Sequence, residues 1–408
     1  MSPTRLRARP LLLAVLAAAL LAAPALPLGS CGPRDQQSPE ALAGHYEGNV
    51  AWRDATLPVD LDVEVRAGAL VARVTVPGLL ARDVPVEGFA FRSPNVAFRL
   101  PMGAETWDFD GWFRRGTFSG TFSGGSLPRT ANRATLPRLG LRRVARRADP
   151  YATDTVRFAG GAASLAGTVL TPADSLARPA VVLLQGGGGG TRADGLELAD
   201  RFARAGFVAL AFDARGRGAS AGDAAVALAG HERDAVAVVE FLRGRAGVDS
   251  GRVGVLGAGP GAALAPRVAA RARAAFAIAI SPPGVPLRRA YARQGGPPEW
   301  AGPDADADPA APWAAIGAPA LVLFGERDDV LPAKSAARVR EALRARGASG
   351  TRVETVARAD HALRLTTRPG EPFEFPRFAP SALDTLLAWA RARTGLPPLP
   401  PRLVPPAR

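Results

Sequence analysis

The chain has 408 residues, a formal net charge of +14 and a single cysteine. One cysteine excludes an intrachain disulfide, so the folded domains depend on their apolar cores. The basic residues are spread along the chain, and nearly all are arginines, with Lys334 a rare exception. Because no nucleic-acid recognition motif accompanies this charge, we expect no nucleic-acid partner.

The first thirty residues have the pattern of an export signal. A basic start precedes an apolar stretch over residues 11–26, which is too short and too weakly flanked to predict a transmembrane helix. The stretch ends in Leu-Gly-Ser-Cys at 28–31, which resembles the lipobox of bacterial lipoproteins. That resemblance implies an exported protein, anchored to the cell envelope through an acylated Cys31 and facing the periplasm or lying at the outer membrane. The alternative is an ordinary signal cleavage site beside a stray cysteine.

Residues 31–148 have the pattern of a small antiparallel β domain. Residues 57–65 alternate apolar with polar side chains, which is typical of a strand with one wet face. Further short strands are predicted at 70–76, 95–100, 105–109 and 116–122. Glycine and proline turns between such strands favour a sandwich or a barrel-like sheet. The region holds no cluster of metal-ligating side chains and no candidate nucleophile, so we expect no metal site in it.

From residue 149 to residue 395 the pattern changes to that of an α/β domain. Continuous apolar runs predict buried strands at 180–184, 208–212, 253–256, 276–280 and 320–324. Helical spacing appears between them, at 194–205 and 232–243. Buried strands that alternate with helices predict a doubly wound, mostly parallel sheet. Residues 396–408 form a proline-rich tail.

Three glycine-containing motifs follow predicted strands of this second domain. Gly186, Gly187 and Gly188 form a loop that permits an inward-turned backbone. No Lys-Ser or Lys-Thr pair follows them, which argues against a phosphate-binding loop. The segment 213–220 reads Asp-Ala-Arg-Gly-Arg-Gly-Ala-Ser. At 257–261 the sequence Gly-Ala-Gly-Pro-Gly joins a predicted strand to a predicted helix.

These motifs, in this order, resemble those of the α/β-hydrolase superfamily, in its dienelactone hydrolase and serine aminopeptidase branch. The leading β domain resembles that of exported bacterial α/β-hydrolases. The resemblance implies that the glycine loop supplies an oxyanion donor and that Asp328 and His361 are the acid and the base of a triad. It also implies a structural role for the 213–220 motif, whose matching residues are Asp213, Arg215, Gly216 and Gly218.

The triad lacks its nucleophile, because the family's serine position in G-x-S-x-G is Gly259. The next residue should donate a backbone N–H to the oxyanion, and Pro260 has none. Proline also restricts φ, so a relaxed turn is one expectation. Ser281 ends the neighbouring predicted strand and is the candidate for a displaced nucleophile.

Three hypotheses follow. The first is a pseudo-hydrolase without a cofactor. It binds an acyl, ester or peptide-like ligand, or an envelope protein, in the cleft where the family has its active site. The second is an active esterase or peptidase that uses Ser281 or water activated by His361. The third is a structural envelope protein that acts through its β domain.

Overall fold

The computed structural model describes residues 37–400, apart from 103–104, 126, 128–134, 162, 175, 186–189, 298 and 348. Cys31, the glycines Gly186, Gly187 and Gly188, and the last eight residues of the predicted tail lie outside this part of the chain. The described residues belong to one compact unit that begins at Gln37.

The first sheet is antiparallel throughout, in the strand order β4-β3-β2-β1-β9-β8-β7-β6-β5. Its strands are β1 (Gly44–Trp52), β2 (Ala55–Arg66), β3 (Ala69–Val76), β4 (Ala81–Pro85), β5 (Glu87–Arg92), β6 (Asn95–Met102), β7 (Glu105–Arg114), β8 (Thr117–Ser123) and β9 (Arg138–Val144). The backbone N–H of Val86, between β4 and β5, donates to the carbonyl of Ala72 on β3 at 2.9 Å. β3, which lies next to one edge of the sheet, also contacts β5 at the other edge. The sheet therefore curls into a nearly closed barrel, which confirms the predicted barrel-like form.

The alternation in the sequence explains which face of this sheet is buried. In β2, every second side chain, from Leu57 to Val63, is buried, while their neighbours are partly or fully exposed. Successive side chains of a strand point to opposite faces, so this alternation directs one apolar row into the barrel. The short 3-10 helices η1 (Pro39–Leu42) and η2 (Pro77–Leu79) precede β1 and β4.

The second sheet has the order β10-β11-β13-β12-β14-β15-β16-β17. Its strands are β10 (Tyr151–Gly160), β11 (Ala163–Pro172), β12 (Arg178–Gln185), β13 (Val208–Phe212), β14 (Val248–Ala258), β15 (Ala277–Ile280), β16 (Ala320–Gly325) and β17 (Arg352–Val356). β10, β11 and β13 pair antiparallel, and all pairs from β13 to β17 are parallel. The predicted doubly wound, mostly parallel sheet is therefore confirmed.

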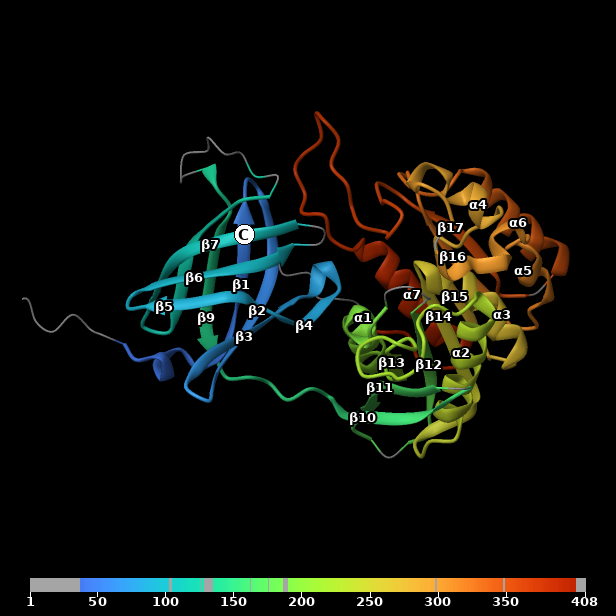
Figure 1. Cartoon of the computed structure of the whole chain (residues 1–408), viewed down its shortest axis with the longest axis horizontal. Helices are drawn as coiled ribbons and strands as arrows, with labels where there is room; N and C mark the ends of the chain where they lie inside the picture. Colours follow the sequence, from blue (N-terminus) through green and yellow to red (C-terminus); the bar gives the residue numbers. More distant parts are fainter. Residues whose placement is uncertain are drawn as a thin grey trace, which may run out of the picture. The chain divides into compact units, whose positions relative to one another are not determined.

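Helices cover both faces of the second sheet (Figure 1). They are α1 (Arg192–Arg204), α2 (Leu228–Arg243), α3 (Pro260–Arg271), α4 (Leu287–Ala290), α5 (Ala311–Ala315), α6 (Lys334–Arg346) and α7 (Pro380–Arg393), with the 3-10 helices η4 (Ala292–Gln294) and η5 (Glu299–Asp306). α1 and α7 pack in one apolar core, and α2, α3, α5 and α6 in the other. The start of the predicted tail is not free of this structure, because Leu396 packs against the core under α1 and α7.

The core of the first sheet contains one residue from far along the chain. Phe375, between β17 and α7, is 1% exposed and belongs to the cluster formed by the strands of the barrel. Its ring lies 6.4 Å from that of Trp107 on β7, and its neighbour Phe373 packs edge-on against Trp52 of β1 at 4.6 Å. The core of the β domain is therefore completed by the segment that follows the second sheet.

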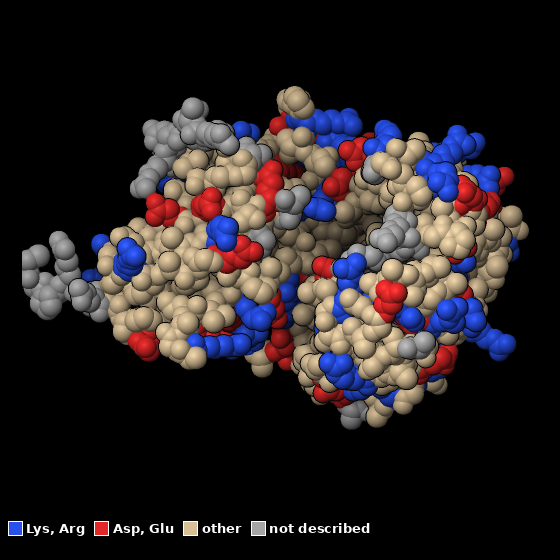
Figure 2. Space-filling view, in the orientation of Figure 1, with Lys and Arg blue, Asp and Glu red and all other residues tan. Residues whose placement is uncertain are grey.

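On the side of the molecule shown in Figure 2, the surface charges do not form one basic patch. Figure 2 shows arginine and acidic side chains interspersed over the side in view. Many of the arginines pair with carboxylates, as Arg288 does with Asp306 and Arg338 with Asp308. Among the helices of the described residues, none has the length and apolar character needed to cross a bilayer.

Candidate functional site

The segment 257–261 forms a sharp turn between β14 and α3. Gly259 has φ 53° and ψ −129°, a backbone conformation that glycine adopts readily and other residues rarely do. A Cβ on Gly257 would lie 2.1 Å from the carbonyl oxygen of Gly261, so the close approach of strand and helix requires glycine at 257. The strand, the turn and the helix of a nucleophile elbow are all present.

Pro260 does not relax this turn. It is the first residue of α3, a position where the fixed φ of proline suits the helix and where a backbone N–H has no helical partner. Among the described residues, a Cβ built on Gly259 would meet no atom within 4 Å, so this position faces open space in that part of the structure. The elbow therefore keeps its shape while it lacks a side-chain oxygen and the next backbone N–H.

Asp328 and His361 are brought together by two loops at the same edge of the sheet. Asp328 follows β16, and its Oδ1 accepts the backbone N–H groups of Val330 and Leu331, each at 2.9 Å. His361 follows β17, and its Nδ1 lies 2.9 Å from Oδ2 of Asp328. The adjacent Asp329 is exposed, and Asp328 is the one of the two neighbouring acids that bonds to the histidine.

The surroundings of Asp328 favour its charged form. Burial alone would raise the pKa of this carboxyl, but the hydrogen bond and the charge of His361, with the two backbone donors, hold its pKa below the ordinary value. A His361 Nδ1–H donated to this carboxylate leaves Nε2 as the acceptor of the neutral ring. That is the arrangement of a general base held by an acid.

His361 and Gly259 line the same pocket, whose volume is about 730 Å³. From the second sheet and its helices come mostly apolar residues, which are Leu183, Leu184, Ala193, Asp194, Gly195, Leu198, Leu256, Ala258, Ile280, Ala362, Arg364 and Phe378. The remaining residues come from the β domain and are Arg73, Leu79, Leu80, Ala81, Asp83, Val84 and Pro85. This volume is typical of a site for a small organic ligand.

The contribution of the β domain to this pocket was missed by sequence reasoning. Leu80 and Val84 lie in a stretch that has no catalytic motif and no unusual composition. Their place at the pocket depends on contacts between segments more than a hundred residues apart. The only local signal was the proline and glycine at 77–78, which predict a turn but not what the turn touches.

Asp213 holds the chain that leads from the glycine loop into α1. Its Oδ1 accepts the backbone N–H of Arg192 at 2.7 Å, and its Oδ2 accepts the backbone N–H of Ala219 at 2.8 Å. Gly218 has φ 50°, and a Cβ there would lie 2.5 Å from this carboxylate. Asp213 and Gly218 therefore have structural contacts, consistent with the role that the resemblance implies.

The other members of this motif also make structural contacts. Arg215 forms a buried ion pair with Asp234 of α2, with Nε and Oδ2 2.5 Å apart. Gly216 has φ 68°, and a Cβ there would lie 2.6 Å from the backbone nitrogen of Ala224. None of the four motif residues lines the pocket.

Ser281 is not joined to the acid and base pair. It is 2% exposed, has φ 45°, and its Oγ has no hydrogen-bond partner in the described part of the chain. The pocket is lined by the preceding residue, Ile280, and not by Ser281. Among the described residues, no group of three or more His, Cys, Asp or Glu side chains is placed to hold a metal ion.

Comparison with known proteins finds a family match over most of the second sheet and its helices. The profile of the dienelactone hydrolase family matches residues 165–372. A search of curated proteins finds no match.

Solved structures with a similar fold include three hydrolases. A dienelactone hydrolase-like promiscuous phosphotriesterase from metagenomic libraries is 21% identical, covers 60% of this chain and 99% of its own, and has a TM-score of 0.45. An esterase of Pyrococcus furiosus is 22% identical over 54% of this chain and 88% of its own, with a TM-score of 0.44. An α/β hydrolase of a Penicillium species is 16% identical over 60% of this chain and 100% of its own, with a TM-score of 0.49.

Proposed function

The chain belongs to the dienelactone hydrolase family, and we propose that it is a member that binds an acyl, ester or peptide-like ligand in the pocket beside His361 without forming an acyl-enzyme. The observation that carries this proposal is the turn at Gly259. Its backbone has the conformation of a nucleophile elbow and faces open space, yet it presents no oxygen or sulfur.

The magnitude of the loss supports a binding role. Removal of a triad serine lowers kcat by about 10⁶, and loss of one oxyanion donor lowers it by about 10²–10³. Both groups are missing at adjacent positions, Gly259 and Pro260. The pocket is lined mostly by apolar residues in the described part of the chain, which supports ligand binding.

A second candidate is hydrolysis by water, favoured by the pairing of His361 with Asp328 at 2.9 Å. The ring nitrogen that remains free could take a proton from a water molecule in the open space above Gly259. The missing N–H at Pro260 weighs against this route, because the oxyanion would lose a donor. Use of Ser281 is weaker still, since its hydroxyl is buried outside the pocket lining.

The third candidate, a β domain that acts alone, conflicts with the burial of Phe375. Deletion of the second domain would remove this ring from the core of the first sheet.

Export and anchoring through Cys31 belong to our proposal, as does the alternative that the ligand is part of an envelope protein. Incorporation of labelled palmitate into the wild type and its loss in Cys31→Ala would support the anchor.

Fluorophosphonate labelling of the purified protein tests the proposal, together with turnover on a panel of esters and amides. We expect neither labelling nor turnover above buffer. Labelling that disappears in Ser281→Ala would overturn the proposal in favour of a displaced nucleophile. Turnover without labelling that disappears in His361→Ala would overturn it in favour of activated water.

A further inference from the structure

One side of the pocket is built by a short segment of the β domain, residues 77–85, which comprises η2, Leu80 and β4. Six of its residues line the pocket, and Leu79, Leu80 and Val84 are its large apolar members. The other side is built mostly by apolar residues of the α/β part, among them Leu198 and Phe378, although Asp194, Arg364 and His361 also line it. A ligand in the pocket would therefore lie between two mostly apolar surfaces, one from the barrel and one from the α/β part of the chain.

The backbone of the 77–85 segment is held in an uncommon shape. Leu80 and Asp83 both have φ 54°, in the left-handed region that residues other than glycine adopt rarely. The carbonyl of Gly78 accepts the N–H of Phe378 at 2.6 Å, and the carbonyl of Asp83 accepts Nη1 of Arg73 at 2.7 Å. Strain of this kind persists where the surroundings impose it, and such positions cluster at ligand sites.

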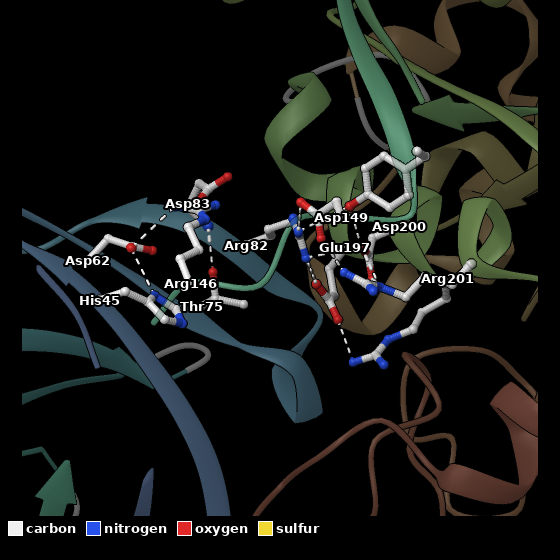
Figure 3. Close-up of polar contacts among 12 residues, drawn as sticks. His45, Asp62, Thr75, Arg82, Asp83, Arg146, Asp149, Glu197, Asp200 and Arg201 are labelled. Atoms are coloured by element: carbon white, nitrogen blue, oxygen red, sulfur yellow. Dashed lines mark hydrogen bonds and ion pairs between the residues drawn. The ribbon is translucent and has the colours of Figure 1, made fainter. Parts of the chain in front are cut away.

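Arg82 fixes the same segment to the second domain (Figure 3). It lies between the two strained residues and points toward α1, where its guanidinium is 3.2 Å from Glu197 and 3.2 Å from Asp200. It also donates to the hydroxyl of Tyr151 at 3.1 Å. Because both carboxylates are almost fully buried, the 77–85 segment is tied to the interior of the second domain rather than resting on its surface.

We propose that the 77–85 segment is the wall of the pocket that selects its ligand, and that it selects by the size of the ligand's apolar part. This inference rests on the proposed function, because it assumes that the pocket binds a ligand. Each methylene group buried between the two apolar sides should increase the affinity about fourfold. Leu80 should contribute strongly, because it lines the pocket and also packs against the core under α1 and α7.

Isothermal titration with hexanoate, decanoate and tetradecanoate tests this inference on the wild-type protein. We expect the affinity to rise with chain length. In Leu80→Asn we expect tetradecanoate to bind about tenfold more weakly, with a flatter dependence on length. Asparagine tolerates the left-handed conformation at this position, so the variant should keep its fold, as thermal unfolding would verify.

Two matched variants make the outcome decisive. Leu176→Asn removes an exposed leucine outside the pocket and should bind like the wild type. Ala362→Phe fills part of the pocket from the side opposite the 77–85 segment, and it should weaken the binding of all three fatty acids. The inference would be overturned if the affinity of Leu80→Asn rose with chain length as steeply as that of the wild type. It would also be overturned if the wild type bound none of the three fatty acids. The proposed function would fail on a different observation, namely covalent labelling by the fluorophosphonate or turnover of an ester or amide.

Discussion

Arg82 of β4 donates from Nη1 to Oε2 of Glu197 in α1 at 3.2 Å, and thereby joins the barrel to the helix that follows the glycine loop. Glu197 is 1% exposed, so this arginine compensates a charge that has almost no contact with water. Arg201, one turn further along α1, pairs with the same carboxylate at 2.5 Å. The contact between the barrel and α1 is thus a charge network and not only an apolar surface.

Replacement of Arg82 by methionine should destabilise the protein by about 1.5–3 kcal/mol, the usual contribution of hydrogen bonds to charged groups. Arg201 remains as a partner of Glu197 in this variant, and it limits the loss of stability. Denaturant unfolding at neutral pH measures it. Arg66→Met is the matched control, because Arg66 pairs with Glu64 on the exposed surface of the barrel and should change the stability by at most about 1 kcal/mol.

The deficit of Arg82→Met should also depend on pH. Burial raises the pKa of Glu197, against the opposing charge of Arg201, so the folded state takes up a proton more readily than the unfolded state. Protonation of Glu197 therefore favours folding as the pH falls from neutral through its raised pKa. Without Arg82 the pKa of Glu197 rises further, so protonation stabilises the variant more than the wild type. The difference in free energy of unfolding between wild type and Arg82→Met should therefore decrease as the pH falls. A deficit that is constant between neutral pH and about pH 5 contradicts the assignment.

Truncation of Phe375 to alanine should lower the free energy of unfolding by about 3–5 kcal/mol, as for other buried phenylalanines. The ring is fully enclosed in the core of the first sheet although it follows the second. Phe373→Ala, whose ring is only partly buried in the same cluster, should have a smaller effect. Equal effects of the two truncations in denaturant unfolding would show that Phe375 does not complete this core.

Asp328→Asn should remove a component of stability that depends on pH. The lowered pKa of Asp328 means that its charged form stabilises the fold above the ordinary aspartate value of about 3.9, and that this is lost as the pH falls through the lower folded value. The variant should be less stable at neutral pH and should lose less stability between about pH 4 and pH 2. Asp329→Asn is the control, because this exposed neighbour should change the stability by less than about 0.5 kcal/mol.

The local parts of this fold could be predicted from the sequence, and its long-range contacts could not. The alternation over residues 57–65 predicted a strand that the structure extends to Ala55–Arg66. The order of the motifs implied that Asp328 and His361 would meet, since loops after parallel strands gather at one sheet edge. The choice between sandwich and barrel depended on how the edges of the sheet approach each other, which no local pattern encodes. The wall at Leu80 depends on distant contacts in the same way.

Restoration of the elbow should reveal how much of the catalytic machinery remains. In Gly259→Ser combined with Pro260→Gly, the new side chain enters open space in the pocket that His361 lines, and the missing backbone N–H returns. We expect this double variant to be labelled by a fluorophosphonate. Gly259→Ser alone should react about 10²–10³ times more slowly, because the oxyanion still lacks the donor at Pro260.

The double variant carries a stability penalty that must be separated from its chemistry. Serine at φ 53° is strained by about 1–3 kcal/mol, so thermal unfolding should accompany the labelling. Addition of His361→Ala to the double variant should abolish the labelling while the protein stays folded, because the serine then lacks its base. A folded double variant that is not labelled would mean that Asp328 and His361, although paired at 2.9 Å, no longer reach the position of the missing oxygen.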